Sequence, residues 1–250
     1  MINNVTKIAR QASLEILKIY RSDNFSVELK QDSTPITKAD LISNKIIING
    51  LREISSHPII TEESPVEYEM RKNWVKYWLV DPLDGTKDFI TKNGGFTVNI
   101  ALIEYGRPTL GVVYVPVSGD VYYAEATKGA FKNDKRIFND STRENLIGAA
   151  SIHHSTDEVK LFFEKHNITN IKKLGSSIKI CKLAEGELDI YPRLNGTKEW
   201  DTAAGHIIAN ESGCKIVDII SKDELVYNKE NIANNHFIAC RNNLDIGIFA

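Results

Sequence analysis

One stretch decides the fold of this chain: Trp78-Leu79-Val80-Asp81-Pro82-Leu83-Asp84-Gly85-Thr86-Lys87-Asp88-Phe89-Ile90. Its first three residues are apolar and predict a buried strand, which ends in two aspartates three positions apart. Gly85 allows a sharp turn, and the residues after it predict the first turn of a helix. Carboxylates at a strand end suit hard cations, and the N–H groups of a helix start suit a phosphate. Asp-Pro and Asp-Gly also occur in solvated turns, so the motif needs support from elsewhere.

The composition is that of a globular chain. It has 250 residues, of which 42% are hydrophobic, enough for one large domain or two small ones. The net charge of -2 and the pI of about 6.3 argue against a nucleic acid polymer as partner. The three cysteines lie far apart without C-x-x-C spacing, which favours a reducing, cytoplasmic compartment. No apolar run approaches the ~20 residues that cross a bilayer, so we expect no transmembrane segment.

Two helices are predicted near the start. Asn4 to Tyr20 has the periodicity of an amphipathic helix, and residues 25–30 alternate like a strand. Thr37 is placed to cap a second helix, from about Lys38 to Ile54. The apolar stripe predicted for this helix consists of Leu41, Ile42, Ile46 and Leu51.

Strands dominate the rest of the first half. Ile59 to Thr61 predicts a short buried strand before the opening stretch, and Phe96 to Ala126 predicts an antiparallel meander of three strands. Helices followed by a run of strands are typical of an α+β unit. We therefore expect an N-terminal α+β subdomain over residues 1–143 that carries the metal-binding motifs.

The second half alternates strands with helices, which predicts a C-terminal α/β subdomain over residues 144–250. The expected strands are 147–152, 188–191 and 215–218, and the expected helices are 157–166, 178–185 and 202–211. His153 and His154 are adjacent on a strand, so their side chains point to opposite faces and rarely share one ion. We interpret them as structural or substrate-edge residues.

Four carboxylates share one kind of position, where an apolar element ends and a polar turn or helix start begins: Glu62, Asp81, Asp84 and Asp201. Two unit charges ~4 Å apart repel by about 4 kcal/mol at an effective dielectric of 20, so a cluster of them needs bound cations. Oxygen ligands without nearby histidine or cysteine favour Mg²⁺ or Mn²⁺. Asp40, in the first turn of the second helix, either complements the helix dipole or joins the site.

Three motifs resemble, in this order, those of the inositol monophosphatase superfamily of lithium-sensitive, Mg²⁺-dependent phosphatases. They are Glu62-Glu63-Ser64, Asp81-Pro82-Leu83-Asp84-Gly85-Thr86 and Trp200-Asp201-Thr202-Ala203-Ala204-Gly205. The ordered set is far more specific than any one part, and the similarity extends over nearly the whole chain. It implies a layered αβαβα sandwich of two subdomains that combines α+β and α/β organisation.

The resemblance also implies which residues bind the ions. Glu62 and Asp81, with the backbone carbonyl of Leu83, hold a first Mg²⁺. Asp81 bridges to a second ion, which Asp84 and Asp201 complete.

Catalytic roles follow from the same resemblance. Thr86 and Glu62 position or deprotonate the attacking water, and Asp40 is a further partner at that water or at a third ion. The N–H groups of Gly85 and Thr86 hold the scissile phosphate. The implied substrate contacts are Glu62, Leu83, Asp84, Gly85, Thr86, Gly175, Ser176, Ser177, Arg193 and Asp201.

The nucleotidase branch of the family implies a small-molecule substrate, 3'-phosphoadenosine 5'-phosphate, hydrolysed to AMP and phosphate in sulfur metabolism. Arg193 offers a planar fork for the second phosphate, and Lys179 is a weaker candidate. An inositol monophosphatase and a non-catalytic sensor of nucleotide and metal remain alternatives. The expected protein is a monomer or homodimer, either free in the cytoplasm or peripheral on the cytoplasmic face of the inner membrane.

Overall fold

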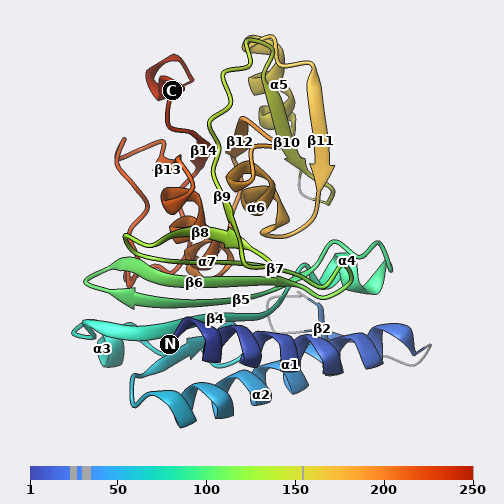
Figure 1. The fold of residues 1–250 in the computed structure, drawn as a ribbon, viewed down its shortest axis with the longest axis vertical. Helices are drawn as coiled ribbons and strands as arrows, with labels where there is room; N and C mark the ends of the chain where they lie inside the picture. Colours follow the sequence, from blue (N-terminus) through green and yellow to red (C-terminus); the bar gives the residue numbers. More distant parts are fainter. Residues whose placement is uncertain (23–26, 30–34, 154, 250) are drawn as a thin grey trace.

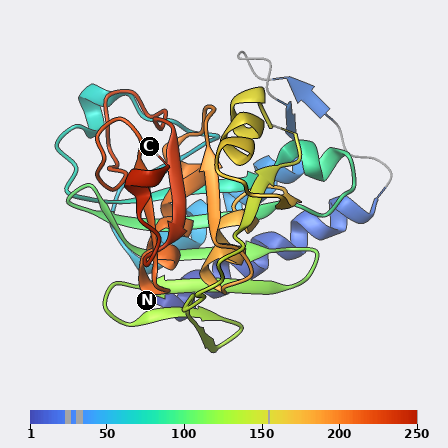
Figure 2. The same cartoon turned by 90° about the horizontal axis from the view of Figure 1, so that it is seen from above.

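The computed structural model describes residues 1–22, 27–29, 35–153 and 155–249. Helices and strands stack in five layers (Figure 1). In order these are α1 (Ile2–Arg21) with α2 (Lys38–Ile54), a seven-stranded sheet, α6 (Ile178–Ala184) with α7 (Glu199–Glu211), a five-stranded sheet, and α5 (Asp157–Lys165). Seen from above, the second sheet lies in front of the larger one and α1 lies behind both (Figure 2). The layered sandwich implied by the resemblance is confirmed.

The larger sheet orders its strands as they follow along the chain. They are β3 (Ile59–Thr61), β4 (Lys76–Asp84), β5 (Thr97–Glu104), β6 (Arg107–Val115), β7 (Asp120–Glu125), β8 (Gly129–Lys132) and β9 (Lys135–Ile137). β3 and β4 are parallel, and all other neighbours are antiparallel. The predicted three-strand meander is confirmed, and β8 and β9, which were not predicted, extend it.

Strand β4 is apolar without alternation because both of its faces are covered. Trp78 and Val80 pack in the core beneath α1 and α2, whereas Tyr77 and Leu79 pack against the layer of α6 and α7. Successive side chains on a strand point to opposite faces, so a central strand between two helical layers needs apolar residues at every position. The opening stretch is therefore the centre of the molecule.

The smaller sheet is mixed, in the order β11-β10-β12-β14-β13. Its strands are β10 (Ile147–Ser151), β11 (Asn170–Leu174), β12 (Ile190–Arg193), β13 (Cys214–Asp218) and β14 (Phe237–Arg241). β10, β11 and β12 run parallel, whereas β14 runs antiparallel to β12 and β13. β11 was not predicted, because this edge strand is exposed and lacks an apolar pattern.

The predicted face of α2 is wrong in part. Leu41 is 53% exposed, whereas Ser43 and Ile47 are buried. The inward face contains polar side chains that bond inside the protein: Ser43 Oγ donates to the carbonyl of Pro82 at 2.7 Å. A prediction based only on apolar residues overlooks such polar side chains. The predicted stripe therefore lies to one side of the face of α2 that is buried in the structure.

Shorter elements complete the chain. They are β1 (Val27–Leu29), β2 (Pro35–Thr37), α3 (Tyr68–Arg71), α4 (Thr86–Ile90) and the 3₁₀ turn η1 (Ile246–Ile248). β1 lies within the strand predicted for residues 25–30, of which 25, 26 and 30 fall outside the described residues.

The subdomain boundary at residues 143 and 144 remains a prediction. Within the described ranges, no helix has the length and apolar character needed to span a bilayer.

Candidate active site

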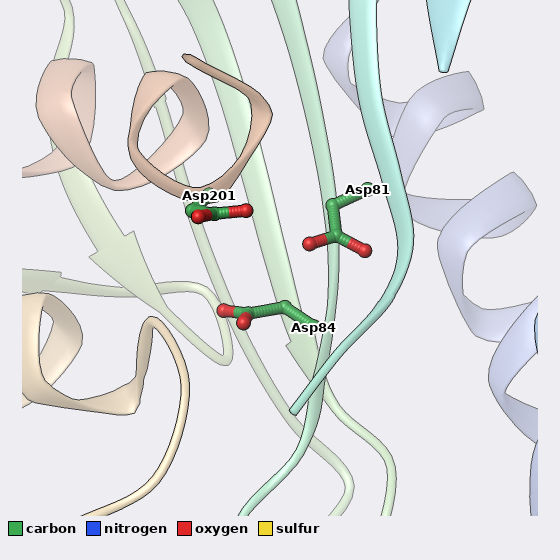
Figure 3. Close-up of side chains that lie close together, drawn as sticks. All are labelled: Asp81, Asp84 and Asp201. Atoms are coloured by element: carbon green, nitrogen blue, oxygen red, sulfur yellow. The ribbon is translucent and has the colours of Figure 1, made fainter. Parts of the chain in front are cut away.

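Three carboxylates from two distant segments meet at one point. Asp81 and Asp84 come from β4 and Asp201 from α7, and their side chains point toward one another (Figure 3). One oxygen of each lies within 4.8 Å of the others. All three line a cleft of about 890 Å³. The predicted convergence of these aspartates is therefore observed.

A bulge in β4 puts both of its aspartates on one side. Asp81 pairs with Asn99 and Asp84 with Thr97, so three steps along β4 match two along β5. In a regular strand, residues three apart point to opposite faces, but one extra residue brings them to the same face. Pro82 lies in this bulge and has no N–H to donate to a ladder. β4 thus continues to Asp84 rather than ending at Val80.

A backbone N–H fixes one oxygen of each aspartate. The donors are Leu83 for Asp81 (3.1 Å), Ser177 for Asp84 (2.7 Å) and Lys198 for Asp201 (2.7 Å). The last contact exists because α7 begins at Glu199 rather than at the predicted residue 202, which makes Asp201 its third residue. Such a contact between the third helical residue and the residue before the helix is half of a capping box.

The three aspartates place several negative charges close together in the cleft. Burial raises the pKa of Asp81, Asp84 and Asp201, and the nearby charge of Asp84 helps to bring the pKa of Asp201 to about 8. Glu62 lines the same cleft, and its charge also raises the pKa of each aspartate. A set of oxygen donors that repel one another when ionised fits a hard divalent cation such as Mg²⁺.

Asp40 and Thr86 form a pair beside the carboxylates. Asp40 is 2% exposed at the start of α2, and Thr86 is the first residue of α4. Thr86 Oγ1 donates to Asp40 Oδ1 at 3.3 Å. Gly85 precedes Thr86 with φ of +93°, a conformation that favours glycine. Asp40 therefore contacts a cleft residue as well as complementing the dipole of α2.

Two buried cations line the cleft together with the carboxylates. Lys179 on α6 is 3% exposed and Arg193 on β12 is 9% exposed. Lys179 Nζ donates to the carbonyls of Ser176 (2.6 Å) and Leu174 (3.2 Å), and burial lowers the pKa of this lysine to about 8. Arg193 Nη2 donates to the carbonyl of Gly196 at 3.1 Å. These groups offer positive charge to an anionic ligand.

The loop from Gly175 to Ser177 is placed only partly as predicted. Ser176 and Ser177 line the cleft, but Gly175 packs behind it: a Cβ there would lie 2.3 Å from the carbonyl oxygen of Gly95. The hydroxyl of Ser177 points inward, 2.8 Å from Asn99 Oδ1. The Ser176 hydroxyl is buried and has no hydrogen-bond partner among the described residues.

The sequence analysis did not identify the two side chains that donate hydrogen bonds to the Asp84 carboxylate. Thr97 and Asn99 on β5 donate to Asp84 Oδ2 at 3.4 and 3.3 Å. Both are fully buried. Their spacing of two residues in an otherwise apolar strand was the signal that could have revealed them.

Of the two histidines interpreted as structural or substrate-edge residues, only His153 lies among the described residues. His153 Nε2 lies 3.2 Å from Oδ1 of Asp88, a residue that lines the cleft. His153 is therefore at the edge of the cleft, as expected, whereas His154 lies outside the described residues.

An αβαβα sandwich that gathers carboxylates from a strand end and a helix start in one cleft defines a class of metal-dependent phosphatases. Within this class, the sequence model of the inositol monophosphatase family matches residues 1–245, and the chain belongs to that family.

Relatives with specific names cover most of the chain. The 3'(2'),5'-bisphosphate nucleotidase CysQ of Buchnera aphidicola (subspecies Acyrthosiphon pisum) is 46% identical over 222 residues, 86% of this chain and 83% of the relative. The CysQ of Escherichia coli K12 is 41% identical over 224 residues, 87% of this chain and 90% of the relative. A crystal structure of CysQ from Bacteroides thetaiotaomicron matches with a TM-score of 0.87 and 37% identity over 97% of each chain.

Proposed function

We propose that this protein is a Mg²⁺-dependent phosphatase that hydrolyses the 3'-phosphate of 3'-phosphoadenosine 5'-phosphate. Water adds to phosphorus, the bond between phosphorus and the 3' oxygen breaks, and that oxygen takes a proton, giving AMP and phosphate. One observation carries the proposal: the cleft holds the three converging aspartates together with the buried cations Lys179 and Arg193. The substrate class, a bisphosphorylated nucleotide, is taken from the names of the relatives, and its adenosine form is what the family resemblance implies.

The metal site is proposed from the donor set. Asp81, Asp84 and Asp201, with Glu62 and the carbonyl of Leu83, would hold two Mg²⁺ ions. When bound, such ions activate water and stabilise the charge of the leaving oxygen.

The remaining groups act on water and phosphate. Thr86 gives its proton to Asp40 Oδ1, so its oxygen lone pairs are free to accept a hydrogen bond from the attacking water. Asp40 is the proposed acceptor of a proton relayed through Thr86, or else a ligand of a third ion. Glu62 orients the same water, and the N–H groups of Gly85 and Thr86 bind the scissile phosphate.

The buried cations select the substrate. Arg193 presents a planar fork that suits the 5'-phosphate, and Ser176 lines the same cleft. We assign Gly175 a supporting role, because its close contacts with Gly95 and with the side chain of Asp88 set how closely this loop approaches α4. Lys179 contributes its charge and holds the loop through two carbonyls.

Phosphate release tests the proposal. The wild-type protein is assayed with 3'-phosphoadenosine 5'-phosphate, AMP and inositol 1-phosphate, each with Mg²⁺ or with a chelator. We expect turnover of the bisphosphate only when Mg²⁺ is present, and little release from AMP. A clear preference for the inositol ester would establish the inositol monophosphatase reading instead. Binding of the bisphosphate without phosphate release would establish a sensor.

Three expectations accompany this function and remain predictions. They are a cytoplasmic location, free or at the inner face of the membrane, a place in sulfur metabolism, and a monomeric or homodimeric state. The three cysteines, Cys181, Cys214 and Cys240, are free and buried in the structure.

A further inference from the structure

The inference concerns Thr37, the residue that precedes α2, and it rests on the proposed function. We propose that Thr37 is a positioning residue that fixes the Asp40 carboxylate. The hydroxyl holds one carboxylate oxygen so that only the other faces Thr86 and the cleft.

Both contacts from Thr37 go to the same oxygen. Thr37 Oγ1 lies 2.5 Å from Asp40 Oδ2, and the Thr37 N–H donates to that oxygen at 2.8 Å. Oδ1 is left for Thr86 Oγ1 at 3.3 Å. Thr37 and Asp40 are each 2% exposed, so water does not compete for these contacts. Two donors on one oxygen prevent the carboxylate from rotating about its Cβ–Cγ bond.

The hydroxyl does more than cap the helix. A capping hydroxyl only needs to accept a backbone N–H, and Thr37 does so from Ala39 at 3.2 Å. The hydroxyl proton of Thr37 can therefore be donated elsewhere, and it is donated to Asp40 Oδ2. Thr156 caps α5 by accepting from Val159 and is not among the described residues that line the cleft, so it represents capping alone.

The start of α2 is also tied to the strand that carries the aspartates. Ser43 Oγ donates to the carbonyl of Pro82, within the bulge between Asp81 and Asp84, at 2.7 Å. Asp40 therefore keeps a fixed position relative to the carboxylate cluster, and Thr37 fixes its orientation. Catalytic groups must be held close to their productive geometry, because a small misplacement lowers the rate of the chemical step.

The test compares Thr37→Val, which keeps the shape and removes the hydroxyl, with Thr37→Ser, which restores it. Thr156→Val is the matched control, because it removes a capping hydroxyl away from the cleft. For Thr37→Val we expect kcat for the bisphosphate to fall about 10- to 100-fold. KM should change by less than about twofold, because the groups proposed to bind the substrate are untouched. Thr37→Ser should recover most of the lost kcat.

Unfolding midpoints are measured for every variant. Thr37→Val and Thr156→Val should both lose stability, the former more because the buried Asp40 carboxylate loses a donor, while only the former loses kcat. Thr37→Ala is carried in parallel in case the extra methyl of valine prevents folding. Wild-type kcat in a folded Thr37→Val or Thr37→Ala protein, or no recovery in Thr37→Ser, would overturn the inference. An inactive wild-type protein would instead overturn the proposed function, so the two failures are distinct.

Discussion

Replacing Asp201 by asparagine should stabilise the protein when Mg²⁺ is absent and abolish its activity. The amide keeps an oxygen that can accept the Lys198 N–H, so the start of α7 is preserved. What is removed is one of three negative charges that lie no more than 4.8 Å apart. Without a bound cation, these charges only repel each other.

The size of the effect follows from this distance. Two unit charges 4.8 Å apart repel by about 3 kcal/mol at an effective dielectric of 20, and Asp201 has two such neighbours. The metal-free protein escapes part of this repulsion by binding protons, as the pKa of about 8 for Asp201 indicates. We therefore expect a gain on the order of 3 kcal/mol at pH 8, which raises Tm by about 6–12 °C for a chain of this size.

The pH dependence has a definite sign. The pKa of Asp201 is raised from 3.8 to about 8, so between these values the folded state holds a proton that the unfolded state has lost. Stability of the metal-free wild type therefore falls as the pH rises through this range. The advantage of Asp201→Asn should accordingly be smaller at pH 6 than at pH 8.

The assay is thermal unfolding with a chelator and with Mg²⁺, together with phosphate release. Mg²⁺ should raise Tm of the wild type, because it binds the folded state, and should raise that of Asp201→Asn much less. Asp218→Asn is the control: Asp218 accepts from the Ile220 N–H at 2.7 Å, away from the cleft. It should neither gain stability in chelator nor lose its Mg²⁺ response. A chelated Asp201→Asn protein that melts below the wild type, or one that retains normal turnover, would refute the reasoning.

Arg193→Ala should raise KM for the bisphosphate more than for a monophosphate ester; equal changes would remove its role. Asn99→Leu should weaken Mg²⁺ affinity about tenfold, because Asp84 loses a side-chain donor; unchanged affinity in a titration would contradict this. Burial lowers the pKa of His206 from 6.5 to about 3. The free energy of unfolding should therefore decrease as the pH falls below 6.5, because only the unfolded state binds this proton. Between pH 7 and pH 5 urea unfolding should show a loss of about 2 kcal/mol that His206→Gln lacks, and equal losses would disprove it.

Elements with a strong local signal were predicted well. The strand, turn and helix of the opening stretch appear as β4, Gly85 and α4, because apolar burial and a glycine with positive φ act within a few residues. The extents of α2 and the capping role of Thr37 were also predicted correctly. The order of the motifs sufficed to identify the family.

Features that depend on tertiary contacts were missed. The apolar pattern misplaced the face of α2 because Ser43 is a polar residue that is nevertheless buried, its hydroxyl satisfied by the carbonyl of Pro82, 39 positions away. The inward turn of the Ser177 hydroxyl, just before α6, depends on Asn99 of β5, which is 78 positions away in the sequence. The edge strand β11 has no apolar pattern to mark it.

By itself, the sequence determined the family and most of the helices and strands, and it predicted which oxygen ligands would gather, since these follow from residue type and short spacing. Only the tertiary structure decided how the ligands meet. The bulge at Pro82 turns Asp81 and Asp84 to one side, and packing of α7 between the two sheets brings Asp201 to them. Bringing together charges that repel one another requires a rigid scaffold, and that scaffold is built by contacts between segments far apart along the chain.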